Sequence, residues 1–200
     1  MLLMVAAAAV FALIFAFGLS NAPPARAAGG AAPLAFAGAS EARVFLSPSE
    51  QVEAAMRGLL PKGTRSILRT HGPMAHGQWH WDDQGVPRGK LTVRVDPSRQ
   101  LLSVFRGPHE IGTAVILYGA KGKETPRGRL PIIGKTRDHH SRTYDAPMPY
   151  SLWLTTDGVA IHGSSVTMGR ASNGCIGVPV PFAAKLFNAA KKGDVVEVLS

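Results

Sequence analysis

Cysteine is nearly absent from this chain, which has one, Cys175, among 200 residues. A single thiol excludes an intramolecular disulfide. In an exported protein, where cysteines usually occur in pairs, a lone thiol is either buried and inert or kept for its chemistry. Cys175 lies among glycine, serine and asparagine rather than in an apolar run, and this setting favours the chemical role.

Acidic residues are also scarce, with 13 against 22 lysines and arginines, for a formal net charge of +9. Such a balance suits nucleic acid, an anionic membrane surface or an acidic polymer. The chain has no run of five basic residues, and its few aromatics (7%) are not spaced as a stacking platform. These absences argue against a nucleic-acid partner and predict a solvated basic surface.

Charge is missing altogether from Met1 to Leu19. Ala25-Arg26-Ala27 then fits the small-x-small pattern of a signal peptidase site, so residues 1–27 are predicted to be a cleaved signal peptide. The apolar run is also close to the length that crosses a bilayer, and no positive residues precede it, so an uncleaved N-terminal membrane anchor is the alternative. Both place the rest of the chain outside the cytoplasm, in the periplasm or cell envelope.

Regular structure is predicted to begin after a flexible linker at residues 28–46, which are rich in Ala, Gly and Pro. Ser47-Pro48-Ser49-Glu50 has the spacing of a capping box and starts a short helix. The helix carries an apolar stripe that we expect to pack against the main domain: Val52, Ala55, Met56 and Leu59.

Residues 47–89 are predicted to form this N-terminal helix and a loop extension. His71, His76 and His80 lie in the loop, but their spacing matches no helical ligand pair, so no metal site is expected there. A surface loop whose tryptophans cover apolar surface is the favoured interpretation.

From Leu91 the pattern changes to short strands at about ten-residue spacing, which is typical of an all-β sandwich or barrel. The first strands are predicted at 91–95, 100–105 and 111–118. A hairpin turning at Asp157-Gly158 follows, and places His162 at a strand end.

A helix is predicted to open at Pro181, with Lys191 and Lys192 in its last turn, and a strand over 195–199 closes the chain. One helix therefore lies against a mainly β domain.

The lone thiol has a histidine thirteen residues before it, in a Gly/Ser-rich connection. A thiol is a strong nucleophile only as thiolate, and a nearby imidazole is the commonest activating group. Ser172-Asn173-Gly174 leaves the backbone before Cys175 accessible, as N–H donors to an oxyanion require. The alternative is a small buried hydrophobe beside an ordinary strand-end histidine.

Six segments, in order, resemble the L,D-transpeptidase catalytic domain (YkuD-type) family over about residues 90–200. They are Val95-Asp96 with Gln100-Leu101, Thr125-Pro126-x-Gly128, Met148-Pro149-Tyr150, Ile161-His162-Gly163, Ser172-x-Gly174-Cys175-Ile176 and Gly193-Asp194-x-Val196. The resemblance implies a mainly β, L,D-transpeptidase-like sandwich or barrel with a helix near the C-terminus.

The resemblance also implies site roles, with no metal and no cofactor. Cys175 would be the nucleophile, His162 the general base, and Gly163 the residue whose carbonyl holds the other ring nitrogen. The backbone N–H groups of Asn173, Gly174 and Cys175 would form the oxyanion hole. Substrate contacts would come from Tyr150, Met148, Arg170 and Arg142.

The implied function is that of a peptidoglycan L,D-transpeptidase, which cross-links stem peptides through a Cys thioester and so serves cell wall biogenesis and cell shape. One alternative is an L,D-carboxypeptidase or endopeptidase on the same stems. Another is a catalytically lapsed wall-binding module. Two departures motivate it, because the family usually has histidine where this chain has Asn173 and arginine where it has Gly177.

Overall fold

The computed structural model describes residues 42–200. The predicted signal peptide or anchor, and all of the predicted linker except its last five residues, lie outside this range. Within it, β1 (Arg43–Phe45) occupies the end of that linker and pairs with β2. The linker prediction is therefore wrong at its C-terminal end, because long-range pairing decides the conformation there. No helix in residues 42–200 has the length and apolar character to cross a bilayer.

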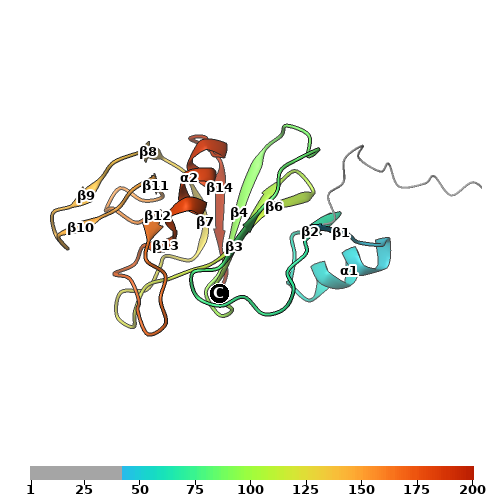
Figure 1. The fold of residues 1–200 in the computed structure, drawn as a ribbon, viewed down its shortest axis with the longest axis horizontal. Helices are drawn as coiled ribbons and strands as arrows, with labels where there is room; N and C mark the ends of the chain where they lie inside the picture. Colours follow the sequence, from blue (N-terminus) through green and yellow to red (C-terminus); the bar gives the residue numbers. More distant parts are fainter. Residues whose placement is uncertain (1–41) are drawn as a thin grey trace, which may run out of the picture. The chain divides into compact units, whose positions relative to one another are not determined.

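The larger sheet has the order β1-β2-β6-β5-β4-β14-β7, with β3 paired to β6 (Figure 1). Its other strands are β2 (Ser66–Leu68), β3 (Trp79–Trp81), β4 (Leu91–Asp96), β5 (Leu101–Arg106), β6 (His109–Val115), β7 (Gly128–Pro131) and β14 (Val195–Val198). β4 alternates buried and part-exposed residues because one face covers the core. β6 is buried throughout, since β2, β3 and β5 all pair with it.

The smaller sheet has the order β13-β12-β11-β8. Its strands are β8 (Gly134–Thr136), β11 (Ser151–Trp153), β12 (Ala160–Ser164) and β13 (Ile176–Pro179). β11 and β12 form the predicted hairpin, and β12 pairs with β13 in parallel. A two-stranded ribbon, β9 (His140–Ser141) with β10 (Ala146–Pro147), leaves this sheet between β8 and β11.

Helix α2 (Val180–Ala189) contacts β12 of the smaller sheet and β3 of the larger one (Figure 1). Its buried side chains are Phe182, Ala183 and Leu186. The Phe182 ring meets Trp81 edge to face with ring centroids 5.5 Å apart. The mainly β fold with a helix near each end of the described chain is confirmed.

The C-terminal end of α2 differs from the prediction. Lys191 and Lys192 lie beyond the last turn, which contains no basic residue. Lys135 of β8 instead donates from Nζ to the carbonyls of Phe187 and Ala190. A cation from a strand distant in sequence therefore satisfies the carbonyls at the helix end.

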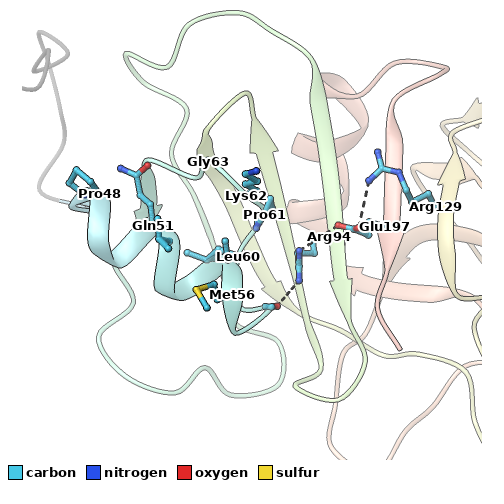
Figure 2. A pocket seen from close by; sticks show the side chains of 13 residues that line it. Pro48, Gln51, Met56, Leu60, Pro61, Lys62, Gly63, Arg94, Arg129 and Glu197 are labelled. Carbon is cyan, nitrogen blue, oxygen red and sulfur yellow. Dashed lines mark hydrogen bonds and ion pairs between the residues drawn. The ribbon is translucent and has the colours of Figure 1, made fainter.

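Helix α1 (Pro48–Met56) has the predicted capping box at Ser47 and Glu50, but the predicted packing of its stripe is wrong. Val52 is 59% and Met56 83% exposed. The sheet residues that face α1 across a cavity of about 790 Å³ are Arg94, Arg129 and Glu197, as Figure 2 shows. This charged face gives the stripe no apolar surface to bury against.

The strands before β4, namely β1, β2 and β3, belong to the larger sheet together with β4, β5 and β6. Buried Arg43 of β1 donates to Ser66 Oγ of β2 (3.1 Å) and to the carbonyl of Asp82 just after β3 (2.6 Å). Ser66 Oγ in turn shares a 2.8 Å hydrogen bond with Nδ1 of His109 in β6. Paired strands and a buried polar network thus join the predicted extension to the core.

Candidate active site

The parallel register of β12 and β13 brings the sequence-predicted thiol and imidazole to one place. His162 is opposite Gly177 and Ile161 is opposite Ile176. Side chains alternate along a strand, so Cys175, two residues before Gly177, lies on the same face as His162. Ile161 and Ile176 take the other face and are buried in the core.

A cavity of about 480 Å³ opens on that face, and both Cys175 and His162 line it. The larger cavity beside α1 contains no cysteine or histidine and lies at a different part of the surface. Further predicted residues that line the smaller cavity are Gly163, Asn173, Met148 and Arg170. The structure therefore assembles most of the predicted site from segments between β10 and α2.

His162 has a defined tautomer. Its Nδ1 lies 2.9 Å from the carbonyl oxygen of Gly163. A carbonyl accepts and never donates, so Nδ1 carries the proton and Nε2 of the neutral ring is left with its lone pair. Burial lowers the pKa of His162, the bond to Gly163 opposes that shift, and His139 adds to it. The ring is thus held as a neutral base.

The surroundings of Gly163 leave little room for a side chain. A Cβ there would lie 3.1 Å from Cγ of Pro149 and 3.2 Å from Cγ2 of Val180. The N–H of Gly163 donates to the carbonyl of Pro149 at 2.8 Å, so the segment before β11 crosses β12 at close range. The glycine after the histidine therefore positions the carbonyl that fixes the imidazole.

The Cys175 thiol is partly buried at the edge of the cavity. Sγ lies 3.7 Å from the carbonyl oxygen of Gly158. Burial raises the pKa of the thiol, and a hydrogen bond with the Ala160 backbone only partly offsets it. The free protein therefore holds a protonated thiol near a neutral imidazole at neutral pH, and ionisation of the thiol needs a base.

The turn before Cys175 presents backbone donors. Gly174 has a φ of +104°, which a residue with a side chain rarely adopts, and the Ser172 hydroxyl donates to the carbonyl of Cys175. Across residues 42–200, the N–H groups of Asn173, Gly174 and Cys175 donate to no backbone or side-chain acceptor. Free donors beside a thiol are what an oxyanion hole requires. Asn173 and Cys175 line the cavity, whereas Gly174 is not among its lining residues.

The segment 118–125 is hydrogen-bonded to this turn through Ser172. A Cβ on Gly119 would overlap the carbonyl oxygen of Lys123 at 2.0 Å, and the Gly119 N–H donates to Thr125 Oγ1 at 3.0 Å. Ser172 donates from its N–H to the carbonyl of Tyr118 at 2.9 Å. Thr125 of the Thr-Pro-x-Gly segment is buried and acts through the loop rather than through a contact with the cavity.

Two predicted substrate contacts are not among the residues lining this cavity. The Tyr150 ring packs against Phe187 of α2, with centroids 5.8 Å apart, and Arg142 is exposed on the ribbon. Sequence reasoning missed other lining residues, including Leu117, Tyr144, Ser164 and Val180. Of these, only Ser164 could have been predicted to line the cavity, because it is two residues after His162 in the same strand and so lies on the same face.

Metal-ligand clusters are absent from the part of the chain that the structure describes, where no three His, Cys, Asp or Glu side chains gather.

The family model described as the L,D-transpeptidase catalytic domain (YkuD) matches residues 90–198, more than half of the chain. The chain belongs to this family. Its members are L,D-transpeptidases, cysteine-dependent enzymes that act on cell wall peptidoglycan. The family resemblance seen in the sequence is confirmed.

Solved L,D-transpeptidases share the fold of this L,D-transpeptidase-family chain. The enzyme from Stackebrandtia nassauensis aligns with a TM-score of 0.52 and 25% identity, covering 57% of each chain. One solved in complex with imipenem aligns at 0.51 with 26% identity, covering 55% of this chain and 59% of that one. An L,D-transpeptidase from Mycobacterium smegmatis aligns with a TM-score of 0.52 and 20% identity, covering 56% of this chain and 59% of that one. At this identity the likeness shows the fold alone.

The chain spans less than two thirds of the length of these relatives. Among proteins of curated function, none matches it significantly.

Proposed function

We propose that the chain is a peptidoglycan L,D-transpeptidase that works through a thioester on Cys175. One observation carries the proposal. His162 donates from Nδ1 to a carbonyl, so the lone pair of Nε2 is free in the cavity that the thiol also lines. A neutral base, a protonated thiol and three free N–H donors are the parts that acyl transfer needs.

In the first half-reaction, Nε2 of His162 takes the thiol proton and Sγ attacks the carbonyl carbon of a donor stem peptide. The N–H groups of Asn173, Gly174 and Cys175 bind the oxyanion of the tetrahedral intermediate. When the intermediate collapses, the C–N bond breaks and the imidazolium gives its proton to the departing amine. A thioester on Cys175 and a free D-amino acid result.

In the second half-reaction, the amine of another stem peptide attacks the thioester carbonyl. His162 accepts the proton of that amine, and the Cys175 sulfur leaves and is reprotonated. The product is a new amide cross-link. Arg170 and Met148, which line the cavity, are the proposed contacts to the stem.

The two departures from the family pattern remain compatible with this chemistry. Asn173 acts through its backbone N–H, which does not depend on the side chain. A Cβ on Gly177 would lie 3.1 Å from Cβ of Ser164 and 3.4 Å from Cβ of Leu117. Ser164 and Leu117 therefore occupy the space beside residue 177 that a larger side chain would need, so glycine at this position fits the packing around it.

A carbapenem tests the nucleophile. Imipenem should add its mass to the protein at Cys175, as shown by intact-mass and peptide mass spectrometry, and Cys175→Ser should give no adduct with an unchanged melting temperature. Absence of an adduct on folded wild-type protein would refute the thioester mechanism and favour the lapsed wall-binding module.

Muropeptide analysis separates the two enzymatic functions. Incubation with tetrapeptide stems should yield cross-linked dimers, because an amine acceptor competes with water for the thioester. If only trimmed tripeptides form, the enzyme is the L,D-carboxypeptidase or endopeptidase instead, with the same acyl-enzyme.

Export completes the proposal, because a peptidoglycan substrate lies outside the cytoplasm. Residues 1–27 are the proposed signal peptide, with an uncleaved membrane anchor as the alternative. N-terminal sequencing of the exported protein distinguishes them: a start at Ala28 shows cleavage, and a start at Met1 shows the anchor.

A further inference from the structure

A third cavity, of about 520 Å³, is lined by the C-terminal half of α2, the end of β3, the loop before β4 and Arg106 at the end of β5. Four cationic side chains and one carboxylate line it: Arg88, Arg106, Lys185, Lys191 and Asp83. Asp83 is already paired with Arg106 at 3.1 Å. The remaining positive charges are Arg88 in the loop before β4, Lys185 in the middle of α2 and Lys191 just beyond the end of α2.

Those three charges, on Arg88, Lys185 and Lys191, have no ion-pair partner anywhere in residues 42–200. Arg106 is held rigidly at the cavity, since its side chain is only 16% exposed. Like charges that converge on one concave surface repel each other and raise the local concentration of anions. The cavity is therefore built to attract a ligand with more than one negative charge.

Trp81 gives the same cavity a flat apolar surface. The indole is fixed on two sides, because it lies where a Cβ of Gly112 would be, 2.5 Å from its Cε3, and meets the Phe182 ring. An indole fixed by packing presents its surface at little entropic cost. A partly exposed aromatic ring among cations suits a ligand that has an apolar ring face as well as anionic groups.

We propose that this cavity binds an anionic saccharide, that is, a sugar ring carrying carboxylate or phosphate groups. Its volume lies within the roughly 300–1,000 Å³ range of small-ligand sites, which suits one or two sugar rings. A nucleic acid would need a longer basic track with several stacking aromatics. Here one aromatic and one compact set of cations lie together.

This site is separate from the thiol. Val180, at the start of α2, lines the cavity of Cys175, whereas Lys185 and Asn188 further along α2 line this one. At about 1.5 Å per residue, Lys185 and Asn188 lie roughly 7.5 and 12 Å from Val180 along the helix axis. Binding of a saccharide here needs no acyl transfer, and it holds whether or not the proposed function does.

Fluorescence titration of the full chain with trigalacturonate (carboxylate) and glucose 1-phosphate (phosphate) tests the proposal. Saturable binding of either is expected, weaker at 200 mM than at 50 mM salt, with no binding of neutral maltotriose. Arg88→Glu/Lys185→Glu should weaken it at least tenfold. The control Lys62→Glu/Lys192→Glu makes the same charge change at exposed sites outside the cavity and should stay within twofold. Cys175→Ser should bind like wild type.

Three results would overturn the proposal. Equal losses in the two double variants would show attraction by net charge alone. Saturable maltotriose binding, or no binding of either anionic sugar, would remove the anionic saccharide. Tighter binding of a single-stranded DNA oligomer, lost in Arg88→Glu/Lys185→Glu, would reassign the cavity to nucleic acid. Circular dichroism confirms that both double variants remain folded.

Discussion

Burial acts on Cys175 and His162 so that both stay uncharged. It raises the pKa of the thiol and lowers the pKa of the imidazole. An ion pair between them is therefore disfavoured in the free protein. In the proposed mechanism the thiol is ionised only as substrate arrives and the proton moves to the ring. General-base catalysis, rather than a standing thiolate, is the mechanism consistent with these shifts.

The pH dependence of acylation follows from the lowered pKa of His162. In the proposed mechanism the neutral imidazole is the base, so the rate of acylation by imipenem should be maintained below pH 6.5 and fall only as the pH passes through that lowered pKa. His162→Ala should acylate at least a hundredfold more slowly at pH 7. Stopped-flow fluorescence across pH 5–9 measures both, and unchanged acylation of the variant across pH 6–9 would refute the base role.

Ser172 lines the catalytic cavity, and we expect its main effect to be on the position of the proposed oxyanion donors. Its hydroxyl donates to the carbonyl of Cys175 across the turn. Ser172→Ala should slow acylation about tenfold, or ~1.4 kcal/mol in the barrier, with little change in imipenem binding, because the loosened turn weakens only the transition-state contact. Ser165→Ala, which removes another hydroxyl from the same cavity, is the matched control. Equal effects in both variants would contradict the positioning role.

At the scale of elements, α2 connects the site to the rest of the fold. Its N-terminal residue lines the catalytic cavity, its middle is buried against both sheets, and its C-terminal carbonyls are bonded by Lys135. The Lys135 ammonium also lies 4.3 Å from the centroid of the Phe187 ring. One side chain of β8 thus replaces the cap that the helix's own sequence does not provide.

Lys135→Met should lower the free energy of unfolding by about 1 kcal/mol, because it leaves two helix-end carbonyls without a donor while keeping the length of the side chain. Urea denaturation measures the change. Lys192→Met, at an exposed residue beyond the helix, should stay within about 0.5 kcal/mol. A larger loss in the control than in Lys135→Met would show that the cap comes from the C-terminal lysines.

For the whole molecule, the buried network of Arg43, Ser66 and His109 holds the first strands to the sheet. Burial lowers the pKa of His109, and the charges of Arg43 and Arg65 lower it further. Burial raises the pKa of neighbouring Glu110. The two groups therefore affect stability in opposite directions as the pH changes.

The direction in which pH changes the stability through His109 depends on which state, folded or unfolded, binds the proton more tightly. A lowered folded-state pKa means that the unfolded chain binds the proton more tightly, so stability is full above about pH 6.5 and is lost as the pH falls through the folded pKa. Glu110 contributes oppositely, losing stability as the pH rises from about 4.5. His109→Asn should remove the loss below pH 6.5. Urea melts at pH 7.5 and 5.5 check this, and an identical pH slope in the variant would contradict it.

Much of the architecture and the site was accessible from sequence because the signals were local. Strand alternation from Leu91, the Asp-Gly hairpin and the ordered family segments predicted the β fold and placed Cys175 and His162 together. The capping box at Ser47 predicted where α1 begins. Each of these depends on residues close together in the chain.

Tertiary structure decided what depends on contacts between distant segments. The stripe of α1 has the periodicity of a packed helix, yet it stays exposed because the sheet presents charge to it. The Tyr150 ring packs against Phe187 and does not line the cavity. Lys135, rather than Lys191, bonds the carbonyls at the C-terminal end of α2. Most of all, lysines and arginines that are distant in the sequence line one cavity only because α2 packs beside β3. Amphipathic spacing tells which face of an element is apolar but not what will lie opposite it.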